Sequence, residues 1–175
     1  WKDSVTDVGD VYTVPHYLYD DLLSDEQRNA TAQVFYGEAS HGRPVSPLDI
    51  CEASLRYVYH HNPNIVPVVI GGDHSVGWPA FKAAFDHWEG QHGRRIGLLH
   101  FDAHTDLLQE RLGVQYCFAT WAYHANELLK RDGRLVQVGI RTSGRSKAHW
   151  ESSLNVRQYW ADDPLVATVD QLVDE

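Results

Sequence analysis

The sequence contains no methionine, only two cysteines and no long apolar run. Two cysteines, Cys51 and Cys117, cannot form a disulfide framework in 175 residues, so we expect a cytoplasmic protein. No apolar run approaches the roughly 20 residues that a membrane-spanning helix needs, and no secretory signal precedes residue 15, so no membrane partner is expected. Because methionine is missing even at position 1, we expect the chain to be incomplete at both ends.

Basic residues are also scarce. Lys and Arg number 15 against 24 Asp and Glu, which gives a formal charge of −9 with the histidines neutral. Nucleic-acid binding needs a basic surface, so no nucleic-acid partner is expected. The acidic balance suits a cationic small ligand, although acidic soluble proteins are common and charge alone does not decide. The length predicts a single domain over residues 1–175.

Short apolar runs alternate with helical patterns along the chain. The run 64–70 is continuous and rich in β-branched residues, and 95–101 and 134–140 are similar, so each is predicted to be a buried strand. This alternation predicts an α/β fold with an open, mostly parallel sheet flanked by helices. A short strand is also expected within 4–14, and helices over 24–35 and 46–62 (with Ser24 and Ser46 as N-caps), 78–91, 119–133 and 163–175.

Polar side chains follow two consecutive apolar runs, at the point where each strand is expected to end. "GGDHS" places Asp73 and His74 after the first, and "HFDAHTD" places Asp102, His104 and Asp106 after the second. Ligands of open α/β sheets bind outside the carboxyl ends of the strands. Alternate residues of an extended segment point the same way, so the D-x-H-x-D side chains are expected to converge.

Two carboxylates and an imidazole held together suggest a divalent cation, because burial and like charge otherwise disfavour ionised carboxylates. Mixed Asp and His ligands suit manganese, zinc, iron, cobalt or nickel better than calcium. His74 would add a second nitrogen from the neighbouring strand end. Taken alone, "GGDHS" is equally an ordinary turn in which Asp73 or Ser75 caps the next helix, and D-x-H-x-D is only moderately specific.

The two motifs together resemble the first two signatures of the ureohydrolases, which include arginase, agmatinase and formimidoylglutamase. The resemblance runs from "DVGDV" (7–11) to "VQVGIR" (136–141) and implies an arginase-like three-layer α/β sandwich. It implies two divalent ions, with manganese expected and nickel, cobalt, iron or zinc open, that share a hydroxide for attack on a guanidinium carbon. By motif, His74 and Asp106 would bind one ion, His104 the other and Asp102 both, with Asp73 supporting His74.

Two features depart from that family. Its third motif, S-x-D-x-D, has no counterpart here, since the acids of 162–174 lie around and on the last expected helix. Many relatives also carry an "SHG" loop whose histidine assists proton transfer, and the aligned positions here are Cys117 and Phe118. His124 lies six residues beyond Phe118, on the helix expected over 119–133, and the sequence leaves open whether it reaches the site. No residue is assigned to proton transfer.

The leading hypothesis is a dinuclear-metal hydrolase of a cationic guanidino or amidino small molecule, which releases urea or an analogue. Relatives are usually homo-oligomers, so the same is expected here. The alternatives are a non-catalytic relative that binds or scaffolds, and a metal-dependent deacetylase of related fold. A strand ending in D-x-D shortly after Glu175 would favour the hydrolase over both alternatives.

Overall fold

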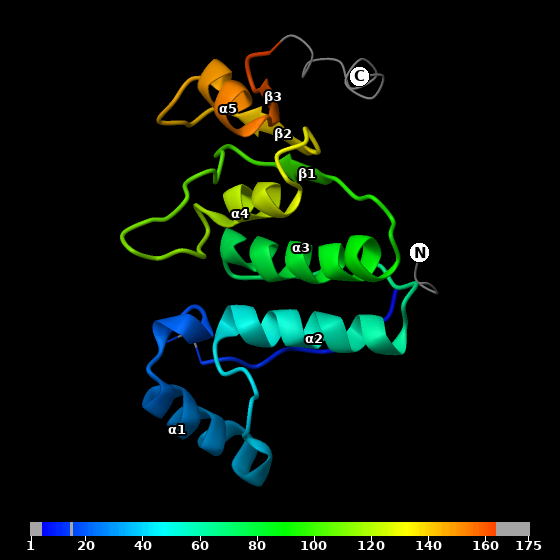
Figure 1. Ribbon diagram of the computed structural model, residues 1–175, viewed down its shortest axis with the longest axis vertical. Helices are drawn as coiled ribbons and strands as arrows, with labels where there is room; N and C mark the ends of the chain where they lie inside the picture. The colour runs from blue at the N-terminus through cyan, green and yellow to red at the C-terminus, as the bar shows by residue number, and fades with distance from the viewer. Residues whose placement is uncertain (1–4, 15, 164–175) are drawn as a thin grey trace.

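The computed structural model describes residues 5–14 and 16–163. Its sheet has three parallel strands in the order β1 (Leu98–Phe101), β2 (Leu135–Ile140) and β3 (Arg157–Trp160). In Figure 1 the helices α2, α3 and α4 are stacked between α1 and the sheet, and α5 lies beside β3. The predicted parallel sheet with flanking helices is therefore confirmed.

The described residues form five α-helices and several shorter turns. None of these helices is long and apolar enough to cross a membrane. A π-helical turn, η4 (Asp86–Gln91), continues α3, so the helix predicted over 78–91 is confirmed. The α-helices are α1 (Asp25–Tyr36), α2 (Pro47–His61), α3 (Gly77–Phe85), α4 (Trp121–Leu128) and α5 (Lys147–Leu154), and the 3-10 turns are η1 (Asp20–Leu22), η2 (Gly37–Ala39) and η3 (His74–Val76).

The two expected N-caps behave differently. Ser24 forms a capping box at α1, because its Oγ accepts from the Gln27 N–H at 3.2 Å and Gln27 Oε1 accepts from the Ser24 N–H at 3.0 Å. Ser46 occupies the N-cap position of α2, as predicted, but its side chain makes no capping bond there. The backbone N–H of Ser46 donates to Asp20 Oδ1 instead, at 2.8 Å, so a distant carboxylate holds the start of α2.

The largest core cluster joins the helices to β2. Packing of α2 on α3 and of α3 on α4 brings aromatic and aliphatic side chains together, and Ala122 and Ala125 are fully buried where α4 approaches its neighbours. Burial of this apolar area is the main force that holds the layers. The buried members are Tyr19, Leu48, Trp78, Phe81, Leu107, Trp121, Ala122, Ala125, Leu129, Leu135, Trp150, Leu154 and Val156.

The strand predicted over 64–70 is wrong. This segment is not assigned as strand and pairs with no described one. Val66, Val68 and Ile70 are 81%, 84% and 94% exposed, so the segment is not buried on both faces. Pro67 has no N–H to give to a sheet, which weakens pairing further. Residues 5–14 likewise contain no strand, and 164–175 lie outside the described residues.

The other two predicted strands are observed, with one difference. β2 is buried along most of its length, as predicted. In β1 only His100 is buried, whereas Leu99 and Phe101 are 57% and 67% exposed. No described element covers the face of β1 that carries these two apolar side chains, so the expected burial on both faces is wrong there.

Candidate metal centre

The turn that carries His74 depends on a close backbone approach. A Cβ added to Gly71 would lie 2.5 Å from a methyl group of Val76, so glycine is required there. Asp73 Oδ1 then accepts from the Ser75 N–H at 2.8 Å and caps η3. Asp73 therefore fixes the backbone of the turn that presents the His74 imidazole.

Asp102 follows β1 and is fixed by the neighbouring strand. Its N–H donates to the Val138 carbonyl at 3.1 Å, which continues the ladder one residue beyond β1. Its Oδ1 accepts from the His104 N–H, also at 3.1 Å. These two contacts hold Asp102 at the edge of the sheet where the strands end, which is the edge predicted from the sequence.

Asp106 has an unusual backbone conformation. Its φ is +50°, a left-handed value that costs a non-glycine residue free energy and that clusters at functional sites. Its Oδ2 accepts from the Trp121 indole N–H at 2.9 Å, and its carbonyl accepts from the Tyr123 N–H at 3.2 Å. Residues at the start of α4 therefore fix both the side chain and the backbone carbonyl of Asp106.

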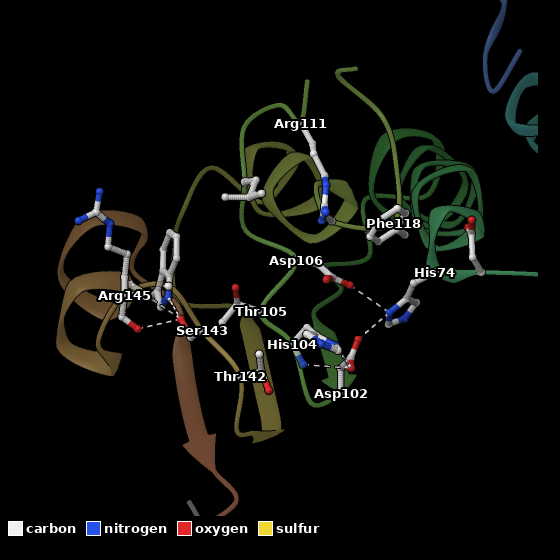
Figure 2. A pocket seen from close by; sticks show the side chains of 15 residues that line it. His74, Asp102, His104, Thr105, Asp106, Arg111, Phe118, Thr142, Ser143 and Arg145 are labelled. Atoms are coloured by element: carbon white, nitrogen blue, oxygen red, sulfur yellow. Dashed lines mark hydrogen bonds and ion pairs between the residues drawn. The ribbon is translucent and has the colours of Figure 1, made fainter. Parts of the chain in front are cut away.

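These placements bring imidazole and carboxylate groups into contact. His74 Nδ1 lies 2.8 Å from Asp102 Oδ2 and 3.0 Å from Asp106 Oδ2. With His100, these residues form a group whose ligand atoms all lie within 4.8 Å of one another. Figure 2 shows His74 approaching the two carboxylates from α3's side of the cavity.

The charges of the group are coupled. The hydrogen bond to Asp106 raises the pKa of His74 against the opposing effect of burial. Burial disfavours ionised Asp102, but the hydrogen bonds from the His104 N–H and the His74 ring, with nearby positive charge, lower its pKa to about 2. Burial lowers the pKa of His100. The group therefore contains an ionised carboxylate ready for a cation.

One cavity of about 520 Å³ is lined by all five of the residues that the sequence singled out. The structure does not bring them equally close, because the His104 side chain is 62% exposed and stands outside the close group. Its Nδ1 lies 3.4 Å from Asp102 Oδ1, the carboxylate oxygen that does not face His74. The five residues that the sequence singled out are Asp73, His74, Asp102, His104 and Asp106.

Sequence reasoning missed two residues of this region. His100 belongs to the close group and is 2% exposed, and Trp121, 4% exposed, binds Asp106 and lies with its ring centroid 4.8 Å from that of His74. A single histidine inside the apolar run "LLHF" was the available signal for His100. Nothing in the sequence indicates the hydrogen bond from Trp121 to Asp106.

The segment after the second motif forms one wall of the cavity. Phe118 lines it and is 44% exposed. His124 lies elsewhere, because its Nε2 faces the carbonyls of Gln109 and Gln115 at 3.1 and 2.9 Å. His124 therefore fastens the loop before α4 and does not line the cavity.

The donor set fits a divalent cation. Ligands about 2 Å from one ion lie about 3 to 4 Å apart, close to the spacings among His74, Asp102 and Asp106. Nitrogen and carboxylate donors together suit a transition metal. A cation would also separate groups that now contact one another directly.

Several known proteins are similar to this chain in sequence. The sequence model of the arginase family matches residues 3–175. Agmatinase of Bacillus subtilis (strain 168) is 26% identical over 133 residues, which are 75% of this chain and 43% of that protein. The mitochondrial guanidino acid hydrolase of Homo sapiens is 39% identical over 113 residues, 63% of this chain and 31% of that protein.

The fold is similar to that of a solved relative. Formimidoylglutamase from Bacillus subtilis subsp. subtilis str. 168 superposes with a TM-score of 0.56 at 22% identity, over 73% of this chain and 39% of that one. The chain spans less than half the length of each of these three proteins.

Proposed function

Because this chain belongs to the arginase family, we propose that it is part of a dinuclear metal-dependent hydrolase. The substrate is a guanidino or amidino small molecule, whose C–N bond is cleaved to release urea or an analogue. The observation that carries this proposal is the contact of His74 with two carboxylates in a cavity at the carboxyl edge of a parallel sheet. The acidic group would attract a guanidinium cation as well as a metal.

The geometry of Asp102 supports two ions. Its Oδ2 faces His74 at 2.8 Å, and its Oδ1 faces His104 Nδ1 at 3.4 Å. One carboxylate thus presents each oxygen to a different histidine, as a bridging ligand does. We assign His74 and Asp106 to one ion, His104 to the other and Asp102 to both, with manganese as the expected metal. Bound ions would lower the pKa of a water molecule and supply hydroxide at neutral pH.

The test counts metal and product together in the full-length protein. We expect about two manganese ions per chain by elemental analysis, and urea or ammonia release from a panel of guanidino compounds. A chelator should abolish release and added Mn²⁺ should restore it. His74→Ala should weaken the binding of one ion selectively. His149→Ala, at an exposed position outside the cavity, should change neither the metal content nor the amount of product released.

Three outcomes separate the hypotheses. Full activity after complete removal of metal would contradict a metal-dependent hydrolase. Metal binding without release from any guanidino compound would favour a binding protein, and release of acetate from acetylated amines would favour a deacetylase. A cytoplasmic location and a homo-oligomeric state are further parts of the proposal, to be checked by fractionation and by light scattering.

The cavity wall suggests a preference for one class of guanidino compound. Arg111 lines the cavity, its guanidinium lies 5.0 Å from the centre of the Phe118 ring, and it forms no ion pair with a described residue. Figure 2 shows its side chain directed toward the cavity. A substrate with a cationic guanidinium near the carboxylates and an anionic group at its other end would match both charges.

Arg111→Gln should therefore change specificity more than catalysis. We expect kcat/KM for 4-guanidinobutanoate to fall about 10-fold or more, since hydrogen bonds to charged groups contribute about 1.5 to 3 kcal/mol. The kcat/KM for agmatine, which ends in an amine, should stay the same or rise. Equal losses for the two compounds would show that Arg111 does not sense the charge of the substrate.

A further inference from the structure

A row of buried polar side chains crosses the sheet behind the cavity. His100 of β1, Gln137 of β2 and Gln158 of β3 are partners in the parallel register. They are 2%, 0% and 1% exposed. Buried polar groups need hydrogen-bond partners within the protein, so the direction of each bond in this row can be followed atom by atom.

The hydrogen bonds of the row run in one direction. Trp160 Nε1 donates to Gln158 Oε1 at 3.0 Å, and Gln158 Nε2 donates to Gln137 Oε1 at 2.7 Å. Gln137 Nε2 donates to the Thr105 carbonyl at 2.5 Å and faces His100 Nδ1 at 2.8 Å. Because an indole N–H only donates and a carbonyl only accepts, both amides have a fixed orientation.

This orientation selects the tautomer of His100. Its Nδ1 faces an amide N–H and must accept, so a neutral ring carries its proton on Nε2. Nε2 lies 3.4 Å from Asp102 Oδ2 and 3.9 Å from Asp106 Oδ2. It is buried and has no hydrogen-bond partner among the described residues. An N–H donor is thus directed into the group of carboxylates without a completed bond.

Two roles are open to a histidine in this place. As a metal ligand it would need a free electron pair on Nε2, and that position is taken by the proton. As a donor it needs an acceptor, and a carboxylate oxygen that binds a cation through one electron pair can accept an N–H through another. The direction of the glutamine row excludes the first role and fits the second.

We propose that His100 is a positioning residue that donates from Nε2 to the metal-binding carboxylates of Asp102 and Asp106, and that the row Gln137–Gln158–Trp160 fixes the tautomer that allows this. The proposal rests on the proposed function, since it takes the two carboxylates as metal ligands. It assigns a role to three side chains on two strands that do not reach the cavity, the buried Gln137 and Gln158 and the half-buried Trp160. It also makes His104 the second imidazole ligand.

The first experiment observes the ring directly. Long-range ¹H–¹⁵N correlation spectra of the full-length protein, metal-free and loaded with diamagnetic Zn²⁺, should show His100 with Nε2 protonated and Nδ1 unprotonated. The His100→Leu spectrum assigns the signals. Gln137→Met removes the donor to Nδ1 at similar side-chain size, and the fixed tautomer should be lost. A wild-type ring protonated on Nδ1 alone would overturn the proposal without any variant.

The second experiment separates a donor from a ligand. His100→Leu should weaken Mn²⁺ binding about 10- to 100-fold, the usual cost of losing a partner of a metal ligand. His100→Gln, whose amide can place an N–H near the position of Nε2, should recover most of that loss. His149→Leu, at an exposed histidine, is the matched control and should bind as the wild type does.

The outcomes are distinguishable. Equal losses in His100→Gln and His100→Leu, with one ion fewer per chain in both, would identify His100 as a ligand and overturn the proposal. If the unaltered protein binds no metal, the proposed function fails, while the ring spectrum still decides the tautomer on its own. Thermal unfolding of each variant shows whether a loss of binding reflects a loss of fold.

Discussion

Asp102→Asn is expected to abolish turnover in the full-length protein, by at least about 10³-fold, the upper end of the cost of losing one electrostatic contact to a transition state. Both oxygens of this carboxylate face imidazoles, His74 on one side and His104 on the other. The amide of asparagine keeps the shape but removes the negative charge, so both proposed ions would lose a ligand. The measurement is urea or ammonia release, with bound manganese counted in the same samples.

Asp162→Asn is the control for Asp102→Asn, because Asp162 is exposed and lies outside the cavity. It should leave turnover and metal content unchanged. Unchanged activity of Asp102→Asn at unchanged metal content would refute the dinuclear mechanism for any substrate.

Gly77→Ala is expected to disrupt the metal centre although residue 77 carries no functional group. A Cβ at this position would lie 2.6 Å from the Trp121 ring, so the ring must move. Trp121 donates to Asp106 at 2.9 Å and lies against His74, so its displacement would disturb two proposed ligands. We expect a loss of about 1 to 3 kcal/mol in the free energy of unfolding, as for other overpacked sites, with weaker manganese binding.

The same turn provides the matched control. A Cβ on Gly72 would meet no atom within 4 Å, so Gly72→Ala should fold and bind metal as the wild type does. Chemical denaturation and metal titration of the two variants test the pair. Normal binding by Gly77→Ala would mean that Trp121 does not position Asp106.

The sequence predicted the parts of the fold that depend on periodicity and local chemistry. The capping box at Ser24 and the strand at 134–140 follow from residues close together in the chain. The helix α5 and the strand β3 were missed, because "RQYW" is polar and lacks the apolar run that marks a buried strand. Gln158 is buried through its hydrogen bonds to other side chains, which no periodicity reveals.

The sequence predicted where the candidate site lies, but not the conformations and contacts of its residues. The observed end of β1 carries Asp102, His104 and Asp106, and a turn without the expected strand before it carries Asp73 and His74. All five residues line the cavity. The positive φ of Asp106 and the inclusion of His100 depend on contacts with α4 and β2, which form only when the chain folds. The prediction of a strand at 64–70 failed because apolar, β-branched composition does not by itself establish pairing, and this segment pairs with no described strand.

The row across the sheet also sets an order of events during protein synthesis. His74 meets Asp102 across 28 residues, but His100 meets Gln137 across 37 and Gln137 meets Gln158 across a further 21. At about 5 to 20 residues per second, Gln137 leaves the ribosome about 2 to 7 s after His100. Parallel pairing between such distant segments is slow to form. The nascent chain is thus expected to expose these carboxylates before the row can orient them, so the proposed metal would bind late in folding.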